Sequence, residues 1–131
     1  MLTPHFSVTT DPALHLLRVI MGGFFGINDV ARLAEAHRIA RLQLRCAPNQ
    51  HLTLVDVSDC KLQAQEVVSA FQKMIGDPRY ASRRLAFVTG SSLARMQVRR
   101  ILTRPGTGLF DDVAQAEAWL LEGNLQLDEA G

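Results

Sequence analysis

Residues His51–Val57 read His-Leu-Thr-Leu-Val-Asp-Val, and this stretch decides the fold. Its residues alternate and include the β-branched types that favour strands. Ser58 and Asp59 follow, and an amphipathic helical pattern comes next. We therefore interpret 51–57 as the central parallel strand of a small α/β domain. A binding site is expected at the turn that leaves the carboxyl end of this strand.

The chain on either side continues the same pattern of strands and helices. Short apolar runs bounded by turn residues predict strands, and apolar residues at three- and four-residue spacing predict helices. The predicted strands are 6–9, 14–21, 85–89 and 109–110. The predicted helices begin at Asn28 or Asp29, at Leu62, at Ser91 or Ser92, and at Asp111 or Asp112. This order predicts an α/β fold with a mostly parallel sheet of four or five strands, an antiparallel first edge strand and about four helices.

The length and composition of the chain fit one domain. It has 131 residues, of which 47% are hydrophobic, and we expect a domain over 1–122 followed by a flexible tail over 123–131. The net charge of +1 gives no general attraction to nucleic acid or membranes. No apolar run approaches the roughly 20 residues of a membrane-spanning helix, and the N-terminus has no signal-peptide pattern. A cytoplasmic protein with reduced Cys46 and Cys60 is expected, without metal or cofactor.

Two short motifs give the predicted element order a resemblance to a known fold. Residues 55–58, Val-Asp-Val-Ser, are similar to the Asp-Leu-Ser that ends the central strand of STAS domains. Residues 110–112, Phe-Asp-Asp, with Ala116 and 119–120, Trp-Leu, look like the closing helix of the SpoIIAA-like branch. The chain thus resembles the SpoIIAA-like (STAS-type) domains of anti-sigma-factor antagonists over nearly its whole length. The resemblance implies a non-enzymatic regulatory module that binds a protein partner.

One departure from those antagonists concerns their phosphorylation switch. Their phosphorylated serine stands in an Asp-Ser-Ser-Gly motif, whereas residues 59–64 here read Asp-Cys-Lys-Leu-Gln-Ala. The resemblance also extends to the related CRAL-TRIO lipid-binding architecture, which implies an alternative function as a carrier of a small ligand or lipid. In that alternative, apolar residues around Phe24 and Phe25 would line a cavity of roughly a few hundred Å³, and arginines would hold the headgroup.

The predicted site lies where three turns leave the carboxyl ends of neighbouring strands, because a parallel sheet brings such turns to one edge. Its residues are Asp56, Ser58 and Asp59 after the central strand, Gly22, Gly23, Phe24 and Phe25 after the preceding strand, and Ser91 and Ser92 after the following one. Either one of the two phenylalanines stays exposed as part of a contact surface, or both pack inward.

Each polar candidate at this edge also has a structural interpretation. Asp56 binds a partner or accepts hydrogen bonds from the turn that follows, and we favour the second. Ser58 is a phosphorylation site or a turn hydroxyl, and again we favour the second. A nucleophilic pair of Cys60 with His51 is left open, because such pairing depends on space rather than on sequence distance.

The clearest charge asymmetry is a run of arginines without acidic residues between Arg79 and Arg104. Arg95 and Arg99 are four residues apart on one helix face and, with the serines before them, could bind an anionic small molecule or lipid. The favoured alternative is a basic face paired with the acidic last helix. Nucleic acid is not expected, because few aromatic residues lie among the arginines. The expected partner is a regulatory protein, and a homodimer is left open.

Overall fold

The computed structural model describes residues 3–79, 81–90, 92–102 and 105–130, with the backbone alone at 92–93 and 123–130. Its elements, in chain order, are β1 His5–Asp11, the 3-10 turn η1 Pro12–Leu14, β2 Leu16–Gly23, α1 Ile27–Gln43, β3 Leu52–Cys60, α2 Gln65–Gly76, β4 Arg84–Val88, α3 Ser92–Ile101, β5 Thr107–Phe110 and α4 Val113–Ala130.

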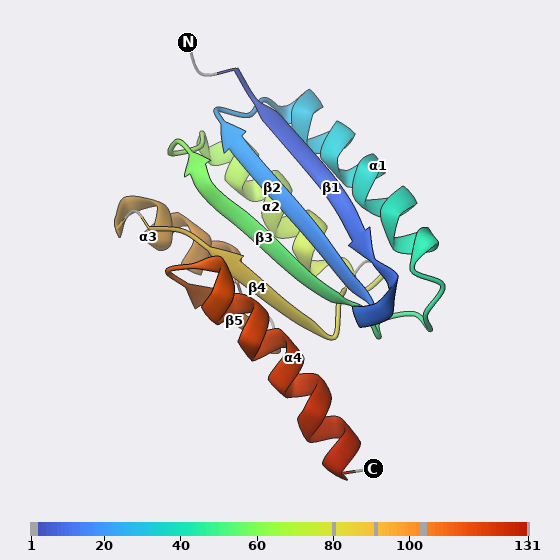
Figure 1. The fold of residues 1–131 in the computed structure, drawn as a ribbon. Coiled ribbons are helices and arrows are strands. Elements are labelled where there is room, and N and C mark those ends of the chain that lie inside the picture. The colour runs from blue at the N-terminus through green and yellow to red at the C-terminus, as the bar shows by residue number, and fades with distance from the viewer. Residues whose placement is uncertain (1–2, 80, 91, 103–104, 131) are drawn as a thin grey trace.

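The strands form one sheet in the order β1-β2-β3-β4-β5 (Figure 1). β1 pairs antiparallel with β2, and every other neighbouring pair is parallel. Each parallel pair is joined through a helix, as a crossover between parallel strands requires. The predicted α/β sheet, its antiparallel first edge strand and its four helices are therefore confirmed.

Helices cover both faces of the sheet, but unequally. Figure 1 shows α1, α2 and α3 behind the sheet and α4 in front of it. The central strand β3 contributes to both cores: Val55 and Val57 belong to the cluster that includes residues of α1–α3, whereas Leu52 and Leu54 pack with α4. This burial on both faces explains the nearly continuous apolar run that marked β3 in the sequence.

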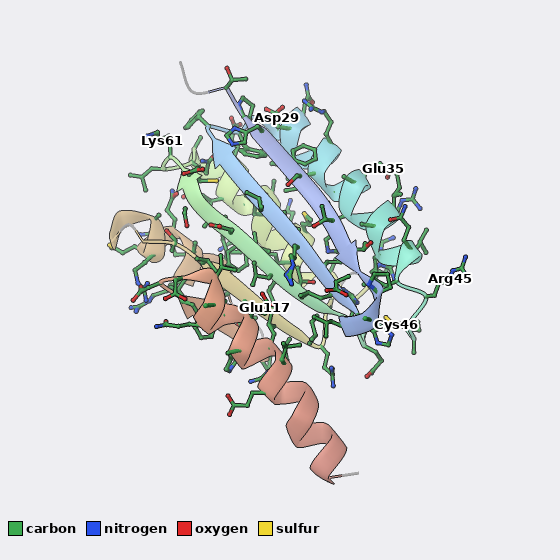
Figure 2. All side chains as sticks on the ribbon, viewed as in Figure 1. Asp29, Glu35, Arg45, Cys46, Lys61 and Glu117 are labelled. Atoms are coloured by element: carbon green, nitrogen blue, oxygen red, sulfur yellow. The ribbon has the colours of Figure 1, made fainter. Side chains whose placement is uncertain are left out.

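The α4 side of β1 and β2 is open to solvent. α4 contacts β3, β4 and β5, and Figure 2 shows Glu117 where this helix crosses the front of the sheet. Arg18 of β2 reaches Glu117 with an Nη2–Oε1 distance of 3.0 Å. Farther along β2, Ile20 is 49% exposed and has no covering helix among the described residues. One half of this sheet face is thus an exposed surface.

Two predicted helix starts are wrong for local reasons. α1 begins at Ile27 with Gly26 as N-cap, rather than with Asn28 or Asp29, because Asp29 Oδ2 accepts the Gly26 N–H at 2.8 Å from three residues downstream. α2 begins at Gln65 instead of Leu62, because the segment before it stays extended.

The predicted end of the central strand is also wrong, since β3 continues to Cys60. Ile20 pairs with Asp56, whereas Gly22 pairs with Asp59, so β3 holds one extra residue between these pairs. Such a bulge lets pairing continue beyond the apolar run. At the other end of the chain α4 extends over Val113–Ala130, and it begins after Asp112, whose Oδ1 accepts the Gln115 N–H at 2.8 Å. None of the helices in the described ranges is long and apolar enough to cross a membrane.

Candidate functional site

The polar candidates of the central strand lie within β3 rather than in a turn after it. Asp56 is half-buried, and its Oδ1 accepts the backbone N–H of Ser58 at 3.0 Å. This is the local hydrogen bond that the favoured structural interpretation of Asp56 expects. Ser58 and Asp59 are exposed beside it. The three residues thus form an accessible polar strand end.

The two glycines at the end of β2 are required by the crossing N-terminal segment. Gly23 has φ +87°, and a Cβ there would overlap the carbonyl oxygen of Thr3. A Cβ on Gly22 would overlap the imidazole of His5. In register, these glycines pair with Asp59 and Cys60 of β3. Close approach of the backbone therefore accounts for Gly22 and Gly23 without a bound phosphate.

The two phenylalanines have opposite environments. Phe25 is 1% exposed and makes an edge-to-face contact with Phe71 of α2, with ring centroids 6.0 Å apart. Phe24 is 42% exposed. Of the two alternatives, the one with an exposed phenylalanine is observed.

The exposed phenylalanine has an exposed apolar neighbour after β3. The Lys61 N–H donates to Gly23 O at 3.1 Å, and the Phe25 N–H donates to Gln63 Oε1 at 2.8 Å. These two bonds align residues 23–25 with residues 61–63. Phe24 and Leu62 are the middle residues of the two segments, and Leu62 is 46% exposed. An apolar rim therefore continues the polar strand end at the carboxyl edge of the sheet.

The third turn and the arginine face are only partly assembled. Ser91 lies outside the described residues, and Ser92 is the first residue of α3. Arg95 forms an ion pair with Asp111, which precedes α4, while Arg99 is exposed. Pairing of the basic face with the last segment is thus seen at Arg95. Arg84 adds to it by stacking 3.7 Å from the centroid of Trp119 in α4.

An apolar cavity of about 100 Å³ lies on the other side of these turns, between the sheet and the three helices behind it. Its floor includes Val19, Val55 and Phe87 from β2, β3 and β4, and its walls include Leu33, Phe71 and Val98 from α1, α2 and α3. Protein interiors normally contain few voids larger than a water molecule. The cavity is therefore the largest departure of this core from close packing.

The two ends of the cavity differ in charge. Lys61 lies beyond the carboxyl end of β3, as Figure 2 shows, and it is exposed where it lines the cavity. Three buried polar residues, His37, Thr53 and Ser82, line it as well. Thr53 lies near the start of β3, eight residues before Lys61, which is roughly 26 Å along a strand. Along β3 the cavity thus runs from a cationic mouth toward an uncharged polar end.

Burial sets the protonation of two groups in this cavity. Burial first, and then the charge of Arg41, lowers the pKa of His37 to about 4, so its imidazole is neutral at pH 7. Burial, followed by the charges of Asp59 and Asp56, raises the pKa of the Cys60 thiol to about 12. The nucleophilic pair of Cys60 with His51 does not form, because the two residues stand at opposite ends of β3, about 30 Å apart along the strand.

Only weak signals for this cavity are present in the sequence. His37 follows Leu33 by one helical turn within the buried stripe of α1, and Thr53 is a hydroxyl between Leu52 and Leu54. Either residue is compatible with an ordinary core. Neither of the two phenylalanines expected to line a pocket does so, and the cavity is smaller than the few hundred Å³ expected.

A second, polar recess of about 350 Å³ lies at the opposite end of the sheet. Arg41, Arg45, Cys46 and His51 are among its lining residues, and Figure 2 shows Arg45 and Cys46 at that end. Within the described part of the chain, no group of three or more histidine, cysteine or acidic side chains is placed to hold a metal ion.

Comparison with known proteins gives a match at the level of the fold. No family model matches the sequence, and no curated protein matches it. The chain is similar to the crystal structure of an uncharacterized protein of the DUF3478 family from Shewanella loihica PV-4, described as having a SpoIIAA-like fold. The TM-score is 0.67 at 14% sequence identity, over 92% of this chain and 95% of that one. The fold of the chain is SpoIIAA-like.

Proposed function

We propose that the protein is a binding module of the SpoIIAA-like class whose ligand is a small, mainly apolar molecule held between the sheet and α1–α3. The observation that carries the proposal is the apolar cavity of about 100 Å³. An apolar cavity of similar size, about 150 Å³, is large enough to bind benzene. The ligand class is therefore a molecule with an apolar part about the size of one aromatic ring.

The energetic cost of an empty cavity supports a role for it. At about 24 cal/mol per Å³, a void of this size destabilises the fold by roughly 2 kcal/mol. That is a considerable share of the roughly 5–15 kcal/mol by which a typical domain is stable. A ligand that fills the cavity restores the missing contacts and raises the stability of the complex.

The chemistry of the lining favours binding over catalysis. At pH 7 a thiol with a pKa of about 12 is protonated and a poor nucleophile. An imidazole with a pKa of about 4 is a weak base at that pH. Cys60 and His37 therefore suit an uncharged pocket that retains its ligand unchanged.

The proposal is tested by titration with toluene, followed through methyl NMR signals. We expect the signals of Val19, Val55 and Val98 to shift, because these residues line the cavity, and those of Leu54 and Val88 on the opposite face to stay in place. The same pattern of shifts on both faces, or none at saturating toluene, would contradict a cavity site.

A matched pair of variants locates the binding. Val98→Phe places a ring in the cavity from α3, whereas Val113→Phe adds the same ring at a position 39% exposed on α4. We expect the first variant to remain folded by circular dichroism but to lose the toluene shifts, and the second to retain them. Unchanged toluene binding by a folded Val98→Phe variant would place the site elsewhere.

A second candidate function is binding of a regulatory protein partner, as the STAS resemblance implies. The observation in its favour is the apolar rim of Phe24 and Leu62 beside exposed Ser58 and Asp59. A chain carrying both Phe24→Ser and Leu62→Ser should lose a partner that the parent chain retains from its own cells, while Val113→Ser should retain it. Equal retention by the double variant would contradict a partner site on this rim.

A further inference from the structure

The hydroxyl of Thr53 is a buried polar group without a partner in the described structure. Thr53 is 3% exposed, lines the cavity, and its Oγ1 forms no hydrogen bond among the described residues. Buried hydroxyls in native proteins are normally hydrogen bonded, because loss of water is otherwise uncompensated. An unpaired oxygen facing a cavity thus marks a place where a ligand atom is missing.

The surroundings of Thr53 are polar but carry no charge. His37 and Ser82 are buried in the same cavity lining, and His37 is neutral at pH 7 because its pKa lies near 4. Lys61 is the lining residue with a charge, and it stands at the other end of β3. Arg41, one turn after His37, lines the second recess and not the cavity. An anionic group placed at Thr53 would lose its hydration without gaining a cationic partner.

We propose that the ligand of this cavity presents one uncharged hydrogen-bonding group, a hydroxyl or a carbonyl, to Thr53 Oγ1. The inference rests on the proposed function and specifies the ligand as a neutral, mainly apolar alcohol, ketone or ester. A threonine hydroxyl suits both types of group, since it donates to a carbonyl and accepts from a hydroxyl. Such a site selects against an analogue without the polar group, because Oγ1 then stays unpaired.

Three probes that share one ring test this selection: toluene, benzyl alcohol and benzoate. They have respectively no polar group, a neutral hydroxyl and a negative charge. Their affinities are measured for the parent chain and for Thr53→Val, which removes the hydroxyl and keeps the shape. Thr9→Val is the control, since Thr9 is an exposed threonine on β1. Thr53→Ser keeps a hydroxyl and tests for rescue.

In the parent chain we expect benzyl alcohol to bind more tightly than toluene, and benzoate to bind most weakly. Thr53→Val should weaken benzyl alcohol about five- to tenfold, the effect of one hydrogen bond, and leave toluene as tight or tighter. Thr53→Ser and Thr9→Val should keep the parental preference. The urea midpoint of ligand-free Thr53→Val should rise, because an unpaired buried hydroxyl has been removed.

The outcomes separate this inference from the proposed function. If toluene binds in the cavity but Thr53→Val leaves benzyl alcohol unaffected, the role of Thr53 is wrong and the cavity function stands. If benzoate binds as tightly as benzyl alcohol, the requirement for an uncharged group is wrong. If none of the three probes binds, the proposed function and the inference are both wrong.

Discussion

At the scale of single residues, Gly23 shows how a glycine is required by a neighbouring strand of chain. Its φ is +87°, and the carbonyl oxygen of Thr3 occupies the place that a Cβ would take. Gly23→Ala should therefore lower the free energy of unfolding by about 2–3 kcal/mol, from backbone strain and displacement of the N-terminal segment. Gly90→Ala is the control, since a Cβ there has no atom within 4 Å. Equal urea midpoints for the two variants would contradict this explanation.

Asp56 is a candidate site residue that also has a local structural role. Its carboxylate accepts one backbone N–H, that of Ser58, from a half-buried position. We expect Asp56→Ala to cost about 1 kcal/mol of stability, and Asp56→Asn, which keeps an acceptor, to cost less. A loss well above about 2 kcal/mol in urea melts would identify Asp56 as a mainly structural residue.

His37 should make the fold sensitive to mild acid. Its pKa falls from 6.5 to about 4 on folding, chiefly through burial and secondly through Arg41. Between these values the unfolded chain binds a proton that the folded chain does not. The contribution of His37 is therefore complete above pH 6.5 and is lost as the pH falls toward 4, by roughly 3 kcal/mol in all. Urea melts from pH 7 to 4.5 should show a shallower loss for His37→Gln than for the parent chain. Parallel curves would assign the acid sensitivity to other groups.

At the scale of elements, α3 is joined to the segment before α2 by two reciprocal amide bonds. The Gln63 N–H donates to Gln97 Oε1 and Gln97 Nε2 donates to Gln63 O, each at 2.9 Å. Gln97→Ala should speed amide hydrogen exchange in α3, with a local loss of about 1–2 kcal/mol and little effect on α1. Gln115→Ala, at an exposed position of α4, is the matched control. Unchanged exchange in α3 would show that apolar packing alone holds this helix.

The elements were more predictable than the site because their signals are local. The apolar runs in β3 and β4 and the helical spacing in α2 depend only on nearby residues, so the order of elements followed from the sequence. The start of α1 did not, because Gly26 is capped by a side chain three residues later. The bulge that carries β3 to Cys60 depends on pairing with β2, which no local pattern specifies. The cavity is harder still, since residues from six elements must fail to fill it together.

At the scale of the whole molecule, the two faces of the sheet have different tasks. The core under α4, with Leu16, Leu52 and Leu120 fully buried, is closed and stabilises the fold. The core under α1–α3 contains the cavity, and the exposed rim of Phe24 and Leu62 lies at the adjoining sheet edge. Binding can thus change one layer while the other stays intact. This division places ligand and partner candidates on neighbouring surfaces of the same domain.

The same division predicts where the chain can be shortened. The residues of α4 that enter the core are Ala116 and Leu120, both 0% exposed, and both precede residue 122. A chain ending at residue 122 should therefore keep its cooperative unfolding, with a melting temperature within about 4–8 °C of the full chain, equivalent to at most about 1 kcal/mol. A chain ending at residue 112 lacks α4 and exposes Leu52, Leu54 and Val88, so it should lose cooperative unfolding or aggregate. If the chain ending at 122 fails in the same way, residues 123–130 belong to the folded domain and are not a tail.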